Sequence, residues 1–329
     1  MIDSRRRAWD RAETLKVQSV SDAFTGLPDA EMLRKVPALA LAFEASPLYG
    51  GITNRNYRIQ TPTGIVVARV SDPGSSSLRI DRAQEYANSV AAAQSGAGAP
   101  VIDYLPGQGV LVVGWIEGRT LTPADVGMEK NLPRIAQACR VLHRGPRFVC
   151  DFNMFDIQSG YLALVLERGF RLPERYLEFM PQVERMRTVM QLRPEPTVPC
   201  NNDLLAANFI DEGDQIRIID YEYSGNNEVS FELGNIWSES TLPDHLLEIL
   251  VREYWQDLGE HAVAAKIARA RIWGLMSKYG WTLWASIQDS ISPMDFDYWS
   301  WGMEKYDRAV AEFDSPELDR LMTTVASED

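Results

Sequence analysis

The sequence is poor in the residues that build disulfides and zinc sites. Its 329 residues include only three cysteines and three histidines. These are Cys139, Cys150, Cys200, His143, His245 and His261. Neither set has the short spacing of a metal motif, and an odd number of cysteines does not make a complete disulfide framework. We therefore expect reduced thiols and no structural zinc.

The sequence also lacks long apolar runs and an excess of basic residues. No stretch approaches the ~20 consecutive apolar residues that a membrane helix needs. The first residues, MIDSRRRAWDRAE, lack the apolar centre of a secretory signal peptide. The net charge is −13, whereas nucleic acids and anionic membranes attract basic surfaces. We expect no nucleic-acid partner, no membrane partner and a cytoplasmic location.

The composition is that of an ordinary globular protein, with 45% hydrophobic and 24% charged residues. The length suits one two-lobed enzyme or two modest domains. Residues 1–40 are predicted to form one or two leading helices. Turn residues and apolar patterning then predict three strands, a helix and two strands. Their bounds are Ala42–Pro47, Tyr57–Gln60, Ile65–Val70, Leu78–Ser95, Ala99–Tyr104 and Val110–Val113.

This order of elements describes a small lobe, residues 41–116, made of an antiparallel sheet and one helix. The remainder, residues 117–329, has mostly helical patterning. The predicted class is therefore α+β, with a small sheet-containing lobe and a larger, mainly helical lobe.

The stretch from residue 198 to residue 239 has the most specific pattern in the chain. Asp203 precedes Asn208 in a polar loop, and the β-branched run Ile216–Ile219 predicts a strand that ends at Asp220. Kinases use this layout: the first Asp orients the attacking hydroxyl and accepts its proton, while the Asn and the second Asp hold Mg²⁺. A plain surface loop is the alternative, because Asn, Asp and Gly gather wherever chains turn.

The predicted small lobe contains candidates for binding nucleotide phosphates. Gly51 lies in a glycine turn where backbone N–H groups can approach phosphate oxygens, and Thr53 and Asn54 add side-chain donors. Arg69 lies in an apolar strand and needs a carboxylate partner, which Glu85 on the next helix supplies. The alternatives are an ordinary hairpin turn without function at Gly51 and a solvent-exposed strand end at Arg69.

Tryptophan is concentrated near the C-terminus. Five of the nine tryptophans lie between Trp273 and Trp301. At 100° per residue, Trp273, Trp281 and Trp284 fall on a different helix face from the aliphatic stripe. Indole rings attract quaternary ammonium groups, so this face predicts an aromatic cage. Packing between two helices is the alternative.

Two of these motifs resemble those of the choline/ethanolamine kinase family. Asp203 to Asn208 and Asp220 to Tyr223 resemble its catalytic and metal motifs, and the IDRxxEYxNS run from Ile80 is similar to bacterial choline kinases. The family shares the two-lobed, protein-kinase-like fold of aminoglycoside phosphotransferases. Asn201 is a departure, since the family usually has a His there, which buttresses the loop.

The resemblance implies roles for individual residues. ATP and Mg²⁺ are the implied cofactors, with Asp203 as the catalytic residue. Asn208, Asp220 and Glu222 are the implied metal ligands, and the backbone at Trp115 and Ile116 is implied to face adenine. The implied residues of the acceptor pocket are Tyr223, Glu239, Trp281, Trp284 and Trp301.

The sequence thus predicts an ATP-dependent kinase that phosphorylates the hydroxyl of choline. Ethanolamine or an aminoglycoside is the alternative acceptor, although a primary ammonium prefers hydrogen-bond acceptors to ring faces. A catalytically dead nucleotide- or amine-binding regulator is the alternative of another class.

Overall fold

A computed structural model of the chain describes residues 22–51, 53–71 and 78–327. Most of the leading helices predicted for residues 1–40 fall outside these ranges. Within them, residues 22–40 form only a short helix α1 (Ala30–Leu33) and one 3₁₀ turn, η1 (Pro37–Leu39). The side chain of Asp29 accepts hydrogen bonds from Arg55 (2.7 Å) and Tyr57 (2.5 Å), which ties this segment to the sheet behind it.

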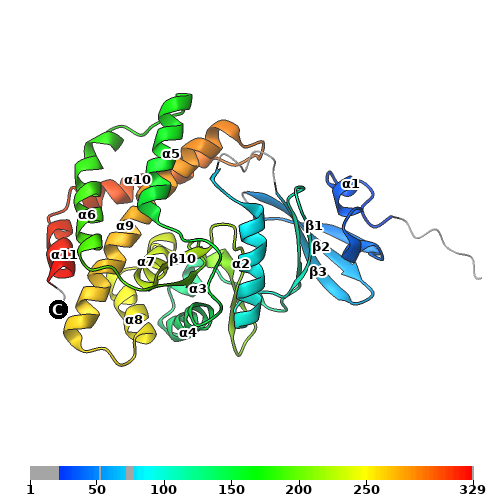
Figure 1. The fold of residues 1–329 in the computed structure, drawn as a ribbon, viewed down its shortest axis with the longest axis horizontal. Coiled ribbons are helices and arrows are strands. Elements are labelled where there is room, and N and C mark those ends of the chain that lie inside the picture. The colour runs from blue at the N-terminus through cyan, green and yellow to red at the C-terminus, as the bar shows by residue number, and fades with distance from the viewer. Residues whose placement is uncertain (1–21, 52, 72–77, 328–329) are drawn as a thin grey trace, which may run out of the picture.

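The small lobe contains a five-stranded antiparallel sheet in the order β1-β2-β3-β5-β4 (Figure 1). The strands are β1 (Glu44–Leu48), β2 (Asn54–Thr61), β3 (Gly64–Ser71), β4 (Val101–Leu105) and β5 (Val110–Gly114). Each lies within three residues of its predicted bounds. A cluster of apolar side chains from β2, β3 and β5 is covered by Phe24, Leu33 and Leu39 of the leading segment.

Helix α2 (Arg82–Ser95) begins four residues later than predicted. Arg79 has a φ of 61°, which a right-handed helix cannot include. The side chain of Asp81 then accepts hydrogen bonds from the backbone N–H groups of Ala83 and Gln84 and caps the helix. Because the helix begins here, Arg82 lies in its first turn.

The larger lobe is helical and is built around one long helix, α9 (Glu260–Ile291), of 32 residues (Figure 1). The other helices are α3 (Pro123–Val126), α4 (Leu132–His143), α5 (Met154–Arg168), α6 (Met180–Leu192), α7 (Val229–Glu239), α8 (Asp244–Tyr254), α10 (Tyr298–Phe313) and α11 (Glu317–Ala326). Helices α5, α7, α10 and α11 all pack against α9. The approach of α7 to α9 is close enough that a Cβ on Gly234 would lie 2.1 Å from the carbonyl oxygen of Ala270.

The predicted catalytic residues lie in the segments that connect short strands between α6 and α7. The strands are β7 (Thr197–Cys200), β8 (Phe209–Asp211), β9 (Ile216–Ile218) and β10 (Gly225–Glu228). The predicted hairpin is confirmed, because β8 pairs antiparallel with β9 across the turn at residues 211–215. Strand β8 also pairs with β6 (Arg119–Thr120), and β7 pairs with β10.

The two-lobed α+β fold predicted from the sequence is confirmed. The lobe boundaries at residues 41 and 117 stay a prediction. Over the parts of the chain that the structure describes, no helix is both long enough and apolar enough to cross a bilayer.

Candidate active site

Two side chains of helix α7 fix the loop that carries Asp203. Both carboxylate oxygens of Glu232 accept backbone hydrogen bonds, from Asn201 (2.8 Å) and from Asn202 (2.9 Å). One turn later on the same helix, the side chain of Asn235 accepts a hydrogen bond from the N–H of Leu204 (2.7 Å). Glu232 and Asn235 are fully buried. The backbone on both sides of Asp203 is therefore fixed by two side chains of one helix.

Asn201, at the position where the family usually has a His, buttresses this loop through its amide. Its Nδ2 donates to the carbonyl oxygens of Ile219 (3.1 Å) and Asp220 (2.7 Å). Its Oδ1 accepts a hydrogen bond from the backbone N–H of Asp203 (3.1 Å). A single side chain thus connects the loop to the end of the following hairpin.

Asp203, Asn208 and Asp220 lie in one site. The side chain of Asn208 donates to the backbone carbonyl of Asp203 (2.7 Å), and the N–H of Ile219 donates to the carbonyl of Asn208 (2.9 Å). Asp220, the next residue, has a φ of 65°. This left-handed conformation is uncommon outside glycine and is found where a functional site over-determines the backbone.

The carboxyl of Asp203 is in an unusual electrostatic environment. Burial raises the pKa of this carboxyl well above its ordinary value, and the negative charges of Glu239, Asp220 and Glu222 raise it further. The positive charge of Lys305 acts in the opposite direction. Within the described part of the chain, no side chain donates a hydrogen bond to this carboxylate. It is therefore free to accept one from a ligand.

Arg69 of the small lobe reaches this site. Its guanidinium pairs with Glu85 on α2, as the sequence predicted, and also with Asp220. The arginine is 8% exposed. A candidate phosphate-binding cation and a candidate metal ligand are therefore in contact across the two lobes.

Arg82 is a second cation at the same place, which the sequence analysis did not single out. It donates to Glu85 (2.6 Å) and to Glu222 (3.0 Å), and Asn54 also donates to Glu222 (2.9 Å). Its position three residues before Glu85 on a helix was a signal for this pair. Two residues of the small lobe therefore donate hydrogen bonds to the carboxylate of the predicted metal ligand Glu222.

The remaining nucleotide candidates lie at the ends of strands, with Gly51 and Thr53 before β2 and Trp115 and Ile116 after β5. A Cβ on Gly51 would lie 3.0 Å from the carbonyl oxygen of Asn54, so the turn is tight. Thr53 is half-buried in this turn. The N–H of Trp115 donates to the carbonyl of Ile65 (3.2 Å), its indole donates to Glu117 (2.7 Å), and Ile116 is buried. No contact brings these four residues to the Asp203 loop.

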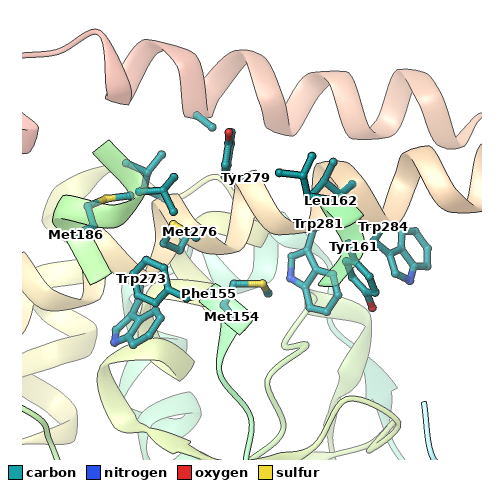
Figure 2. Packing of buried hydrophobic residues seen from close by; sticks show 14 of the residues in the cluster. Met154, Phe155, Tyr161, Leu162, Met186, Trp273, Met276, Tyr279, Trp281 and Trp284 are labelled. Carbon is teal, nitrogen blue, oxygen red and sulfur yellow. The ribbon is translucent and has the colours of Figure 1, made fainter. Parts of the chain in front are cut away.

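The aromatic residues predicted for the acceptor pocket form a continuous chain of contacts. The ring of Tyr223 lies edge-on to Trp281, with 4.9 Å between centroids, and its hydroxyl accepts a hydrogen bond from Trp284 (2.6 Å). The ring of Trp284 in turn lies 5.4 Å from that of Trp301. Figure 2 places Trp281 and Trp284 with Tyr161 at one end of the α9 cluster, away from Trp273 beside Phe155.

These rings are more buried than an open cage would require. Trp281 and Trp284 are 3% and 4% exposed, and Tyr223 is buried too. Trp301 is partly exposed. Packing between helices, the alternative stated above, therefore accounts for much of this tryptophan-rich helix face, because the rings contact one another. Trp273 belongs to the core, where its indole donates to Glu228 (2.7 Å).

Glu239 has a cationic partner within the protein. The Nζ of Lys305 pairs with its Oε2, and both side chains are buried. The same Nζ lies 4.1 Å from the centroid of the Trp301 ring. Lys305 follows Trp301 by four residues on α10, a spacing that places both on one helix face and was a signal for this contact.

Comparison with known proteins agrees with the fold and the motifs. The model of the choline/ethanolamine kinase family matches residues 45–249, well over half of the chain. The chain belongs to the choline/ethanolamine kinase family. Kinases of this family transfer phosphate to a hydroxyl acceptor, and the chain is a phosphotransferase of that class.

The relatives are distant but extend over most of the chain. Ethanolamine kinase 1 of Mus musculus is 26% identical over 297 residues, which cover 78% of this chain and 80% of that protein. A choline/ethanolamine kinase family protein from Mesorhizobium loti has a TM-score of 0.78 at 27% identity, covering 91% of this chain and 98% of the other. The choline kinase LicA from Streptococcus pneumoniae has a TM-score of 0.72 at 21% identity, covering 86% and 98%, which shows a shared fold.

Proposed function

We propose that the protein transfers the γ-phosphoryl group of ATP to the hydroxyl of a small amino alcohol, with choline as the first acceptor to test. One observation carries this proposal: Asp203 lies between two sets of groups that such a reaction needs. Asn208 and Asp220 adjoin it on the hairpin. On the acceptor side, Glu239 lies one turn of α7 beyond Asn235, which binds the backbone of the Asp203 loop, and its negative charge raises the pKa of Asp203.

Asp203 acts on the acceptor hydroxyl. Its backbone is fixed by Asn201 and by α7, so the carboxylate is held in one place. In its ionised form the carboxylate accepts a hydrogen bond from the hydroxyl, orients it and takes its proton as the oxygen attacks phosphorus. The raised pKa of Asp203 makes it a better proton acceptor than an ordinary aspartate.

Asn208 and Asp220 offer the oxygen ligands that Mg²⁺ prefers, and within the described ranges no donor occupies the amide oxygen of Asn208. Glu222 is the third candidate ligand and would have to leave Arg82. Mg²⁺, when bound, offsets the negative charge of the nucleotide phosphates. Arg69 then exchanges its contact with Asp220 for a phosphate oxygen, which its planar fork suits.

Two acceptors of this class are supported by different observations. A quaternary ammonium, as in choline, binds the faces of indole rings, and Trp301 is the partly exposed tryptophan of the predicted pocket. A primary ammonium, as in ethanolamine, needs hydrogen-bond acceptors, and the Oε1 of Glu239 is buried without a partner among the described residues. Relatives named for both activities are similar to this chain.

The test is the release of ADP from ATP and Mg²⁺ by the purified protein with choline, ethanolamine or kanamycin. We expect one of the two small amino alcohols to stimulate release. Asp203→Ala should abolish this turnover while ATP still binds, measured by calorimetry. An active Asp203→Ala variant would remove Asp203 from the mechanism, and ATP binding without any acceptor-dependent ADP release would favour a non-catalytic regulator.

A further inference from the structure

We propose that Lys305 is a specificity-determining residue of the acceptor pocket. Its ammonium group contacts the carboxylate of Glu239 and the ring of Trp301, which a substrate cation would otherwise use. It thereby reduces the preference for a quaternary ammonium over a nitrogen that carries N–H groups. The inference rests on the proposed function, since it concerns the acceptor of that reaction.

The first observation is the burial of the ion pair. Lys305 is 4% exposed, and the side chains of Lys305 and Glu239 are 5% and 2% exposed. Lysine is almost never buried to this degree unless it is paired. Since the pair joins the end of α7 to the middle of α10, it lies between the two helices that supply Glu239 and Trp301.

The second observation is the ring contact. The Nζ of Lys305 lies 4.1 Å from the centroid of Trp301, within the range of a cation–π interaction. A carboxylate and an indole face are the two partners that the sequence analysis expected for a substrate ammonium. In the structure, one cation of the protein already contacts both of them.

The third observation relates this pair to the reaction centre. Glu239 and Lys305 are both among the charges that act on the carboxyl of Asp203, with opposite signs. Glu239 also lies on α7 about one turn after Asn235, whose side chain binds the N–H of Leu204, the residue next to Asp203. The pair therefore lies near the loop of Asp203 rather than in a remote part of the core.

The consequence for an acceptor follows from the hydrogen-bonding capacity of Glu239. Its Oε2 is taken by Lys305, whereas its Oε1 is buried and has no hydrogen-bond partner in the described part of the chain. An ammonium with N–H groups can donate to this oxygen, but a quaternary ammonium has no donor. A quaternary ammonium instead needs free ring faces and a carboxylate whose charge is not neutralised. Lys305 reduces both, because it contacts the Trp301 ring and neutralises Glu239.

The test measures kcat and KM for choline and for ethanolamine in Lys305→Met, which keeps an unbranched side chain and removes the charge. We expect the ratio of kcat/KM for choline to that for ethanolamine to rise on the order of ten-fold. The change should lie mainly in KM, because the ammonium end takes no part in the chemistry. Lys305→Arg, which keeps a cation, should stay within about two-fold of the original ratio.

Helix α9 offers a matched control. Lys266 pairs with Glu195 (2.7 Å) and has its Nζ 5.8 Å from the centroid of Trp255. Lys266→Met therefore removes a paired, ring-contacting lysine in the same lobe, and neither Glu195 nor Trp255 belongs to the predicted acceptor pocket. We expect it to leave the ratio of the two acceptors unchanged, whatever it does to stability.

The outcomes separate the two proposals. If Lys305→Met phosphorylates both acceptors at the original ratio, the role of Lys305 is refuted and the proposed function stands. If the unmodified protein phosphorylates neither acceptor, the proposed function fails first. Should Lys305→Met not fold, Lys305→Gln replaces it, because glutamine is uncharged and can still donate a hydrogen bond to Glu239. It should also raise the ratio in favour of choline, because no protein cation then covers the ring, and an unchanged ratio there refutes the inference equally.

Discussion

Asp203 combines a fixed backbone with an unpaired carboxylate, and this combination determines how it titrates. The amide of Asn201 and the carboxylate of Glu232 fix the backbone around it. Burial and three neighbouring carboxylates favour its protonated form. The proposed reaction needs the ionised carboxylate of Asp203, and this ionised form is therefore destabilised before a ligand arrives.

This environment predicts a pH-dependent effect of Asp203→Asn on stability. The folded-state pKa of Asp203 lies above its unfolded value, so ionisation weakens the folded state as pH rises through that interval. Asparagine cannot ionise, so the variant should be the more stable protein, by about 2 °C or more in Tm at pH 8. The advantage should shrink as pH falls toward 4. Thermal unfolding between pH 4 and pH 8 measures this difference.

Asp125 provides a control in which the pKa shift has the opposite sign. Its hydrogen bonds from Arg119 and Thr122 hold the pKa of its carboxyl below the ordinary value. The stability it contributes is present above its unfolded pKa and is lost only as pH falls through the lower, folded value. Asp125→Asn should therefore lower Tm at neutral pH. A fall in Tm for Asp203→Asn at pH 8 would contradict the assignment of a raised pKa.

Among the elements, helix α7 has the largest part in shaping the site. Nearly all of its residues are buried, and two polar residues on it, Glu232 and Asn235, bind the backbone of the catalytic loop. The helix is itself fixed against α9 by the close approach at Gly234 and by a hydrogen bond from Asn235 to Ser277 (2.9 Å). Packing of α7 on α9 thus positions Asp203.

Substituting Glu232 tests this support. Glu232→Gln keeps one acceptor oxygen but sets an NH₂ group against a backbone N–H that formerly donated to the carboxylate. We expect the free energy of unfolding to fall by roughly 1–3 kcal/mol and kcat to fall on the order of ten-fold. Chemical denaturation and steady-state kinetics measure the two effects.

The control is Glu248→Gln on α8, an exposed residue paired with Arg252. Surface pairs of this kind contribute about 0–1 kcal/mol, so little change is expected. Full activity of Glu232→Gln would show that the loop does not depend on this helix.

At the scale of the whole molecule, charged groups join the two lobes at the site, in addition to the apolar packing of Leu78 and Ile80 against the larger lobe. Arg69 joins β3 to Asp220, while Arg82 and Asn54 join the small lobe to Glu222. Each of these contacts involves a candidate ligand of the metal or of the phosphates. Under the proposed function, binding of the nucleotide and its metal competes with these three contacts between the lobes.

Arg82 is the simplest point at which to test this arrangement. Arg82→Ala removes the guanidinium that pairs with Glu222, so this carboxylate no longer has to leave Arg82 before it binds metal. We expect the Kd for Mg²⁺ and ATP to fall about ten-fold, the effect of one charge-assisted hydrogen bond that no longer has to be broken. Calorimetric titration measures it.

Arg119→Ala serves as the comparison, because Arg119 is exposed and pairs with Asp125 outside the contacts between Arg82, Glu222 and Asn54. It should leave the Kd unchanged. An equal effect of both substitutions would mean that Arg82 acts through general charge rather than through its contact with Glu222.

Local sequence patterns predicted much of this architecture. Alternating apolar residues and turn residues determine the strands of the small lobe, because side chains alternate across a sheet and hairpins need particular turn residues. The order Asp203, Asn208, Asp220 predicted one hairpin site, since two paired strands bring their ends together. The pairing of Arg69 with Glu85 also followed, because a buried cation requires a partner.

Contacts between distant segments were decided only by tertiary structure. The start of α2 depended on the positive φ of Arg79, and the support of Asp203 by Glu232 depended on where α7 packs. The partner of Glu239 proved to be Lys305, 66 residues away. Sequence determines what each side chain can bind, through its charge and donors, but packing of the helices determines which of those partners it meets.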